Sequence, residues 1–329
     1  MPPEDASARH LVWSPAYTTD LTAYGVNKPF ALDRGQCVLD RLAAETGAPL
    51  AYVEPAPLAM DDLLTVHTAA YLESLNNPAV WAEIFELKDA EYEPDRATKP
   101  LNELFDDIRL KAGGTLKAAE LALAHGLSAN LGGGYHHAYP DRGRGFCVLH
   151  DIAVAIRVLQ RRGAIERALV VDLDFHQGDG TAVVFAGDRS VFTLSVHSEE
   201  GWPEEKQEST LDVPIRESEA YTYLERTRAA VADALARFSP DLVVYVAGSD
   251  PYELDVLPGT RFLKLTLGEL KERDEFVIDT IADRKIPLAM VFAGGYGDHV
   301  WQVHYQAVRR LLERASVLTP RTTSTRAPA

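Results

Sequence analysis

The segment 167–180, RALVVDLDFHQGDG, joins a short apolar run to a cluster of acidic and histidine residues. Its first half is rich in Val and Leu without polar alternation, which is typical of a strand covered on both faces. Three further runs have the same character, at 190–196, 241–247 and 287–293. Helical patterns lie between these runs, so the sequence predicts an α/β fold with a mainly parallel central β-sheet flanked by helices.

The amphipathic patterns place helices at 105–125, 151–161, 217–238, 267–283 and 298–314. The pair Gly113-Gly114 is expected to interrupt the first of them. We predict an ordered loop over 201–216 and an exposed flap over the polar segment 86–107. A single catalytic domain is expected over 1–315, followed over 316–329 by a flexible tail rich in Thr, Pro and Arg.

Charge and composition exclude several classes of function. The 329 residues include 49 acidic and 33 basic side chains, a net charge of −16, so neither nucleic acid nor a membrane surface is an expected partner. No run approaches the roughly 18 apolar residues that a membrane span needs. The start of the chain has no secretory signal pattern. Two isolated cysteines, Cys37 and Cys147, make no disulfide framework, and a cytoplasmic location is expected.

Polar side chains follow three of the predicted strands and one apolar stretch before them. The apolar stretch 127–131 runs into GGGYHH, the run at 167–173 into DFHQGDG, the run at 241–247 into GSD, and the run at 287–293 into GGY. Ligands of parallel sheets bind at the carboxyl ends of the strands, where the loops converge. We therefore expect these four turns to share one cleft.

A metal site is predicted from the second and third of these turns. Asp172, Asp174 and His176 occupy alternate positions, so an extended backbone places their side chains on one side. Two carboxylates and an imidazole suit Zn²⁺, but three carboxylates on one ion are less typical, so one acidic residue is expected outside the ligand set. With Asp250, the residues Asp174 and His176 would supply three ligands and leave a position open, as in catalytic zinc sites.

The first and fourth turns offer proton-transfer groups. His136 and His137 follow three glycines, and no Gly-Lys-Ser/Thr follows to make a phosphate loop. A neutral imidazole beside an activated water can accept its proton, and its second nitrogen then needs a carboxylate such as Asp172 or Asp179. Tyr296 follows two glycines, and its hydroxyl could donate a hydrogen bond to an oxyanion.

Each of these features alone also fits an ordinary structural role. A strand-end Asp often caps a loop, a His pair can lie on the surface, and a Tyr is commonly half-buried for packing. Their recurrence at four strand ends favours a functional site over these explanations.

At these residues the sequence resembles the zinc-dependent histone deacetylase family, on the arginase-deacetylase fold, from about Val12 to Leu312. The similarity is greatest to class IV and its bacterial relatives, which share a Gln after the metal-binding His. Five motifs carry it: LGGGYHHAYPDRGRGFCVLHDIAVAI (131–156), VVDLDFHQGDGT (170–181), FTLSVHSEEGWP (192–203), YVAGSDPYELDVL (245–257) and FAGGYGDHV (292–300).

The resemblance implies a role for each residue of the motifs. It implies Zn²⁺ on Asp174, His176 and Asp250, with Fe²⁺ as an alternative ion in the cell. The implied catalytic groups are His136 with Asp172, His137 with Asp179, and Tyr296, which would polarise the substrate carbonyl. The resemblance also implies an acyl-lysine channel lined by Gly145, Phe146 and Gly294, with Cys147 beside it. It further implies a structural K⁺ site formed by Asp172, Asp174, His176, Ser195 and Val196. Arg34 matches an arginine of the family's internal exit tunnel.

Some positions depart from the family pattern. Leu254 stands where the family often has glycine, which we attribute to loop variation. His150 replaces a residue that is often Asn, Ala or Tyr, and we expect it to be structural, as we do His67. The flap at 86–107 matches nothing in the family.

The implied reaction is hydrolysis of an N-acyl amide, with His137 as general base. The partner would be an acylated lysine of a protein or peptide, or a small acylated amine such as an acylpolyamine. One rival is a two-manganese ureohydrolase, which position 178 disfavours because it is Gly rather than a second bridging Asp. Another is a catalytically silent module that binds acyl-lysine, although every metal and proton-transfer position holds a competent residue.

Overall fold

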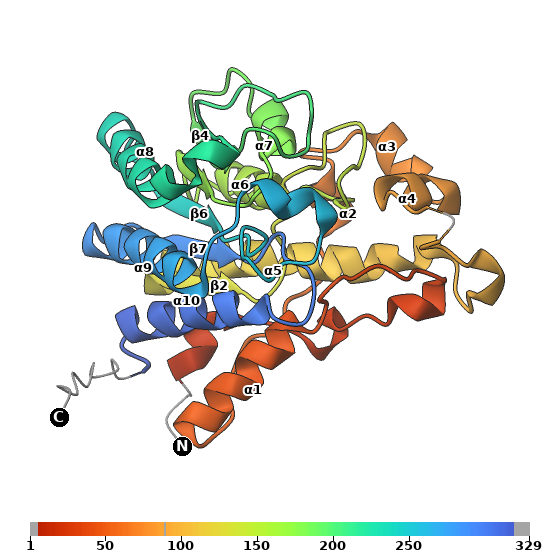
Figure 1. The fold of residues 1–329 in the computed structure, drawn as a ribbon, viewed down its shortest axis with the longest axis horizontal. Coiled ribbons are helices and arrows are strands. Elements are labelled where there is room, and N and C mark those ends of the chain that lie inside the picture. The colour runs from red at the N-terminus through yellow and green to blue at the C-terminus, as the bar shows by residue number, and fades with distance from the viewer. Residues whose placement is uncertain (1–5, 89, 319–329) are drawn as a thin grey trace.

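The computed structural model describes residues 6–88 and 90–318. Within these residues seven strands form one sheet, in which every pairing is parallel, in the order β1-β2-β7-β6-β3-β4-β5 (Figure 1). The strands are β1 (Leu11–Val12), β2 (Leu127–Asn130), β3 (Ala168–Asp172), β4 (Val191–Ser198), β5 (Leu211–Ile215), β6 (Leu242–Val246) and β7 (Leu288–Val291). The predicted α/β class and parallel sheet are confirmed.

Helices flank this sheet. Their bounds are α1 (Arg34–Thr46), α2 (Met60–Leu63), α3 (Ala69–Ser74), α4 (Pro78–Ile84), α5 (Leu104–His125), α6 (Asp151–Arg161), α7 (Asp179–Val184), α8 (Tyr223–Arg237), α9 (Leu267–Asp283) and α10 (Trp301–Arg314). Helices α8, α9, α10 and α1 contact one another in that order, and α5 packs against α6 (Figure 1).

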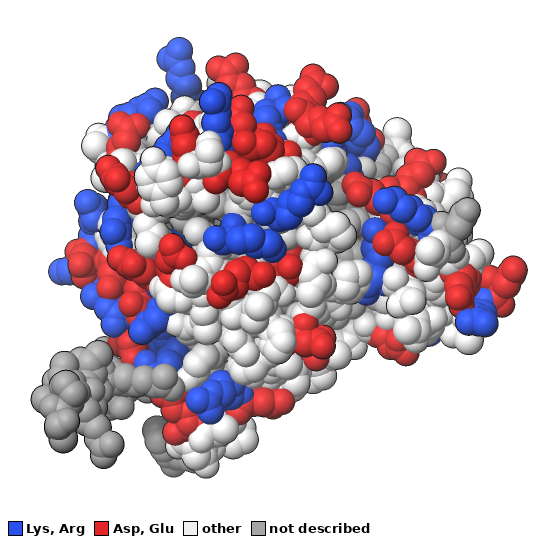
Figure 2. Space-filling view, viewed as in Figure 1, with Lys and Arg blue, Asp and Glu red and all other residues white. Residues whose placement is uncertain are grey.

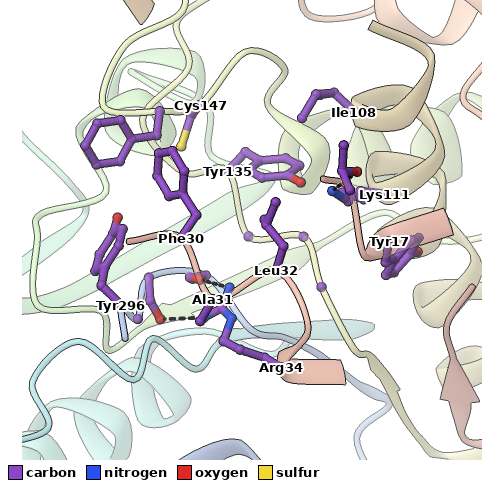
Figure 3. A pocket seen from close by; sticks show the side chains of 18 of the residues that line it. Tyr17, Phe30, Ala31, Leu32, Arg34, Ile108, Lys111, Tyr135, Cys147 and Tyr296 are labelled. Atoms are coloured by element: carbon purple, nitrogen blue, oxygen red, sulfur yellow. Dashed lines mark hydrogen bonds between the residues drawn. The ribbon is translucent and has the colours of Figure 1, made fainter. Parts of the chain in front are cut away.

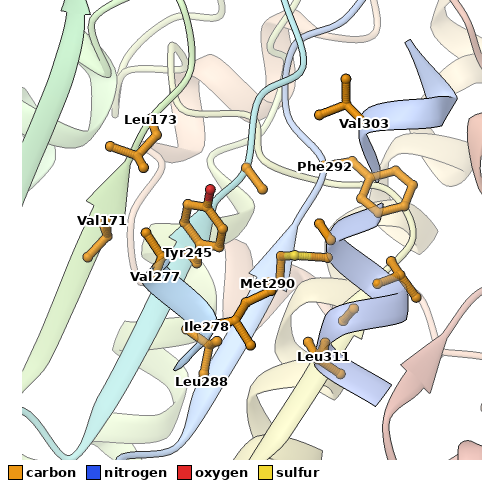
Figure 4. Close-up of a cluster of buried hydrophobic side chains, with 14 of the residues drawn as sticks. Val171, Leu173, Tyr245, Val277, Ile278, Leu288, Met290, Phe292, Val303 and Leu311 are labelled. Carbon is orange, nitrogen blue, oxygen red and sulfur yellow. The ribbon is translucent and has the colours of Figure 1, made fainter. Parts of the chain in front are cut away.

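The sheet separates two hydrophobic cores. Val171, Tyr245 and Met290 point into one core, which α1, α8, α9 and α10 close (Figure 4). Val170 and Val244, one position earlier on their strands, belong to the other core with α5 and α6. Both faces of the central strands are therefore covered, which explains why these runs show no polar alternation.

The strand register aligns the ends that precede the polar turns. Asp172 of β3 pairs with Ser195 of β4 and with Val246 of β6. Val246 in turn pairs with Val291 of β7, which pairs with Asn130 of β2. Because these strand ends lie in one row, the four polar turns leave the sheet at the same edge.

A buried arginine also fixes this edge. Arg273 of α9 donates hydrogen bonds from one guanidinium nitrogen to the carbonyl oxygens of Leu173 (3.0 Å) and Gly248 (2.9 Å). Its Nε pairs with Asp274 at 2.7 Å, and that carboxylate accepts a further hydrogen bond from the Tyr245 hydroxyl. The guanidinium thus ties together the turns that follow β3 and β6.

The structure corrects the expected interruption at Gly113-Gly114. Helix α5 runs through both glycines without a break. A Cβ on Gly113 would collide with the Ala56 carbonyl, and one on Gly114 would collide with Tyr17 and Asn130. Glycine is required here for close approach of neighbouring segments, and the tertiary contacts outweigh its poor helix propensity.

Other boundaries also differ from the predictions. The supposed loop 201–216 contains the edge strand β5. This strand is only partly buried, and its sequence LDVPI has no clear strand pattern. The predicted helix at 217–238 begins as a 3₁₀ segment and becomes α-helical only at Tyr223. Helix α10 begins at Trp301, three residues later than expected. The remaining predicted helices and strands agree to within two residues at each end.

The segment 86–107, predicted as an exposed flap, is partly buried. It contains two short 3₁₀ turns, and Leu101 and Leu104 are buried in the α5–α6 core. Of the predicted tail, Val317 and Leu318 pack against the opposite core, while 319–329 lies outside the described residues.

Charged side chains of both signs occur on the face shown in Figure 2. On the face shown in Figure 2, basic and acidic side chains are interspersed around an uncharged area, and no basic patch is present on this face. Among the described residues, no helix is both long and apolar enough to cross a membrane.

Candidate active site

Three residues from two turns meet at the sheet edge. Asp174, His176 and Asp250 each offer a ligand atom, and these atoms lie within 4.8 Å of one another. His176 Nδ1 is 3.2 Å from Asp174 Oδ1 and 2.9 Å from Asp250 Oδ2. All three side chains are buried. They form the expected candidate metal-binding triad.

Backbone amides orient both carboxylates. The Gly294 N–H donates to Asp174 Oδ2 at 2.8 Å, and the Phe175 N–H donates to Asp250 Oδ1 at 2.9 Å. A Cβ on Gly248 would collide with Asp174, and one on Gly294 would collide with both carboxylates. The glycines of the two turns are therefore needed to admit the acidic side chains.

The donor set fits a divalent cation. Within the described part of the chain, Asp250 Oδ2 is buried and makes no hydrogen bond of good geometry. Burial and the neighbouring Asp174 raise the pKa of Asp250 to about 7. Two adjacent buried carboxylates need a positive charge to be stable, and a bound metal ion would supply it.

Two histidine–aspartate pairs lie next to this triad. His136 Nδ1 lies 2.7 Å from Asp172 Oδ2, and His137 Nδ1 lies 2.6 Å from Asp179 Oδ1. The imidazole rings are 3.9 Å apart between centroids. These are the pairings that the resemblance implied.

The surroundings shift the pKa values of the two imidazoles in opposite directions. For His136, burial is outweighed by the carboxylates of Asp172 and Asp174, which raise its pKa to about 9. For His137, burial and the adjacent His136 lower the pKa to about 3 despite Asp179. At neutral pH this environment favours a protonated His136 beside a neutral His137.

The glycine-rich turn that carries the histidines is held by a buried carboxylate. Asp151, the first residue of α6, accepts hydrogen bonds from the N–H groups of Gly134 (2.8 Å) and Tyr135 (2.7 Å). The preceding His150 caps α6 through its Nδ1, which accepts from the Ala153 N–H. His150 is thus structural, as expected.

Tyr296 is positioned through its backbone. Its N–H donates to Asp255 Oδ2 at 2.7 Å, and its ring lies against Phe30 and Phe146, with centroids 6.1 and 6.0 Å away. Arg34 holds the preceding turn by donating to the carbonyl oxygens of Ala293 and Gly294.

Members of the triad and of both His–Asp pairs border one cavity together with Tyr296, shown in Figure 3. The sequence-predicted site residues on its wall are His136, His137, Gly145, Phe146, Cys147, Asp174, His176, Gly294 and Tyr296, together with Arg34. Asp172, Asp179 and Asp250 do not line it and lie behind the residues that do. The cavity also extends to Tyr17, Thr19, Asp107 and Lys111.

Sequence reasoning assigned no role to two residues beside His137. The Trp202 ring lies 4.7 Å from the imidazole, edge to face. Arg144 pairs with Asp179 at 3.0 Å and lies over the Trp202 ring. Both residues belong to the quoted motifs, which marked them as candidate site residues. The sequence alone did not show that they contact His137.

The residues of the implied potassium site come from β3, the turn after it and β4. Asp172 and Ser195 are register partners on adjacent strands, and Val196 follows in the same strand. Ser195 Oγ is 3.0 Å from His197 Nδ1. The structure brings the set together at one place but does not identify an ion.

A comparison with protein families agrees with this geometry. The profile of the histone deacetylase domain matches residues 28–312, which is most of the chain. The chain belongs to the histone deacetylase family. This membership supports a deacetylating hydrolase.

Three individual proteins are similar to this chain. Histone deacetylase 2 of Arabidopsis thaliana is 31% identical over 316 residues, covering 94% of this chain and 80% of that protein. The acetoin utilization protein AcuC of Bacillus subtilis is 28% identical over 302 residues, covering 85% and 71%. An uncharacterized protein of Picosynechococcus sp. is 43% identical over 205 residues, covering 62% and 67%.

A solved structure supports the fold. The crystal structure of the HDA15 HD domain superimposes with a TM-score of 0.68 at 18% identity, covering 92% of this chain and 90% of that one. This likeness is consistent with the arginase-deacetylase fold predicted from the motifs.

Proposed function

We propose that this member of the histone deacetylase family is a zinc-dependent amidohydrolase that removes an acyl group, chiefly acetyl, from a lysine-like amine. The observation that supports it most is the juxtaposition of a buried Asp174–His176–Asp250 triad with two His–Asp pairs on one cavity. A metal ion held by the triad would polarise the substrate carbonyl and activate a water molecule.

The histidine pair would move the protons. Asp179 holds His137 Nδ1, so Nε2 is left to accept the proton of the attacking water. His136 is held by Asp172 in the same way and is the better proton donor, because its environment favours the imidazolium. A proton delivered to the amine nitrogen lets the C–N bond break.

Tyr296 would stabilise the oxyanion. Burial, with nearby carboxylates, raises the pKa of its hydroxyl well above the usual value, so the group stays a hydrogen-bond donor. Fixed donors aimed at developing negative charge are among the largest catalytic contributions in enzymes. The channel residues Gly145, Phe146 and Gly294 would enclose the aliphatic part of the substrate.

The cofactors and substrates are part of this proposal. We propose Zn²⁺, or Fe²⁺ in the cell, as the catalytic ion, and K⁺ at Asp172, Asp174, His176, Ser195 and Val196. The substrate is an acylated lysine of a protein or peptide. Acylpolyamines are the alternative, and the cytoplasm is the proposed compartment.

The test is a hydrolysis assay with acetyl-lysine peptides and acetylpolyamines, measured before and after removal of metal by a chelator. We expect release of carboxylate from at least one of these classes. Chelation should abolish it, and one equivalent of Zn²⁺ or Fe²⁺ should restore it. Binding of the peptides with no release of carboxylate by the metal-loaded protein would contradict the proposal and favour a silent binding module.

A further inference from the structure

The cavity continues well past the triad. Measured as space open to a water-sized sphere, its volume is ≈ 140 Å³, whereas a single water needs about 10–15 Å³ in this measure. In Figure 3, Tyr296 and Phe30 lie on one side and Lys111 and Tyr17 on the other, with Leu32 between them. This space exceeds what the methyl group of an acetyl substituent fills.

Its far end carries a buried ammonium group. Lys111 belongs to α5 and lines the cavity with only 6% of its surface exposed. Its Nζ donates one hydrogen bond, to Thr19 Oγ1 at 3.2 Å. No carboxylate of the described residues lies within the 4.0 Å of an ion pair with Nζ. An ammonium has three N–H donors, so two have no protein acceptor here.

Among the described residues, Lys111 has no direct counter-ion at this end of the cavity. Asp107 reaches Lys111 only through Thr19, whose hydroxyl donates to Asp107 Oδ2 at 3.2 Å. Arg34 lines the same cavity, and its guanidinium bonds to the backbone carbonyls of Ala293 and Gly294 and to His304, with no carboxylate partner. Arg34 also interacts with Asp174 and Asp250 of the triad, whereas Asp107 is the carboxylate that acts on Lys111.

The ammonium is charged at neutral pH. Burial lowers the pKa of Lys111 to about 8, with Asp107 opposing and Arg34 adding to the shift. A buried cation without a direct counter-ion is costly, and such a group is usually kept for a function. An anion in the cavity would supply the acceptors that Lys111 lacks among the described residues.

We propose that the cavity accepts acyl groups ending in a carboxylate, such as succinyl or glutaryl, and that Lys111 binds this carboxylate. The inference rests on the proposed hydrolase function and names its substrate class. The reaction is the same hydrolysis: water adds to the amide carbon, the C–N bond breaks, the amine takes a proton, and a dicarboxylate is released. Lys111 touches the far end of the substrate and takes no part in these bond changes.

The experiment compares acyl groups of equal length on one lysine peptide. Succinyl is paired with butyryl, and glutaryl with pentanoyl, so that each pair differs by a terminal carboxylate. The measured quantity is the ratio of kcat/KM for the anionic over the neutral member. We expect the wild-type ratio to exceed one for at least one pair and Lys111→Met to lower it about 10- to 100-fold, the range for a hydrogen bond to a charged group.

Two further variants make the test specific. Lys111→Arg should retain the preference for the anionic member. Lys117→Met, on the same helix but with its Nζ 3.5 Å from Glu120 and partly exposed, should leave the ratio unchanged. If Lys111→Met fails to fold, the kcat/KM ratios of the wild type and of Lys111→Arg still test whether the cavity prefers anionic acyl groups.

Several outcomes would overturn the inference. One is a wild-type ratio below one for both pairs, and another is a ratio that Lys111→Met leaves unchanged. If Lys111→Met alters only inhibition by free acetate, the ammonium serves the departing carboxylate and the substrate assignment is wrong. If the metal-loaded enzyme hydrolyses no acyl-lysine at all, the proposed function itself fails, which is a distinct result.

Discussion

Asp250→Asn is expected to yield a folded protein that has lost its metal ion and nearly all activity. The amide keeps an oxygen that can accept the Phe175 N–H, so the turn after β6 retains its hydrogen bond. The substitution removes one of two negative charges from the triad, and with it the preference for a divalent ion. A loss of several kcal/mol of transition-state stabilisation corresponds to about 10³-fold or more in kcat/KM.

The matched control lies at the opposite end of the same strand. Asp241 precedes β6 and accepts hydrogen bonds from the Glu166 and Arg167 N–H groups. Asp241→Asn should keep the metal and the activity. Metal content by elemental analysis, circular dichroism and kcat/KM are measured on both variants. An Asp250→Asn protein with a full equivalent of tightly bound metal and normal turnover would contradict the ligand assignment.

Tyr296→Phe is the second variant with a large expected effect. It should fold, keep one metal ion and lose about 10²–10³-fold in kcat, as is typical when one oxyanion donor is removed. The N–H that binds Asp255 and the ring contacts with Phe30 and Phe146 do not depend on the hydroxyl. The loss should therefore appear mainly in kcat and less in KM.

Tyr221→Phe provides the comparison for this variant, because Tyr221 is 85% exposed and lies away from the cavity. Its activity should match that of the wild type. Wild-type turnover in Tyr296→Phe would refute the assigned role, as would loss of the metal together with the activity, because the defect would then be structural.

The sequence predicted the parallel sheet and the composition of the triad because both depend on local pattern. The run at 167–173 has strand composition, and parallel pairing brings its carboxyl end next to that of 241–247. The placement of Asp174, His176 and Asp250 follows from these two facts. The His136–Asp172 and His137–Asp179 pairings came from the family resemblance, since spacing alone left the partners open.

What the sequence could not predict depends on contacts between distant segments. β1 has two residues, and β5 is a five-residue strand that contains Asp212 and Pro214, so neither shows a clear strand pattern. Gly113 looked like a helix breaker because its close contact with Ala56 is visible only in three dimensions. Lys111 lies in a helix whose sequence pattern does not single it out, and most of the residues that line the cavity beside it come from other segments.

The central claim is that one metal ion sits among Asp174, His176 and Asp250, and anomalous X-ray scattering at the zinc edge tests it most directly. For crystals of the zinc-loaded protein, we predict a single strong peak per chain about 2.0–2.2 Å from a ligand atom of each residue. A peak elsewhere, a pair of peaks bridged by carboxylates, or no peak at this site would contradict the account.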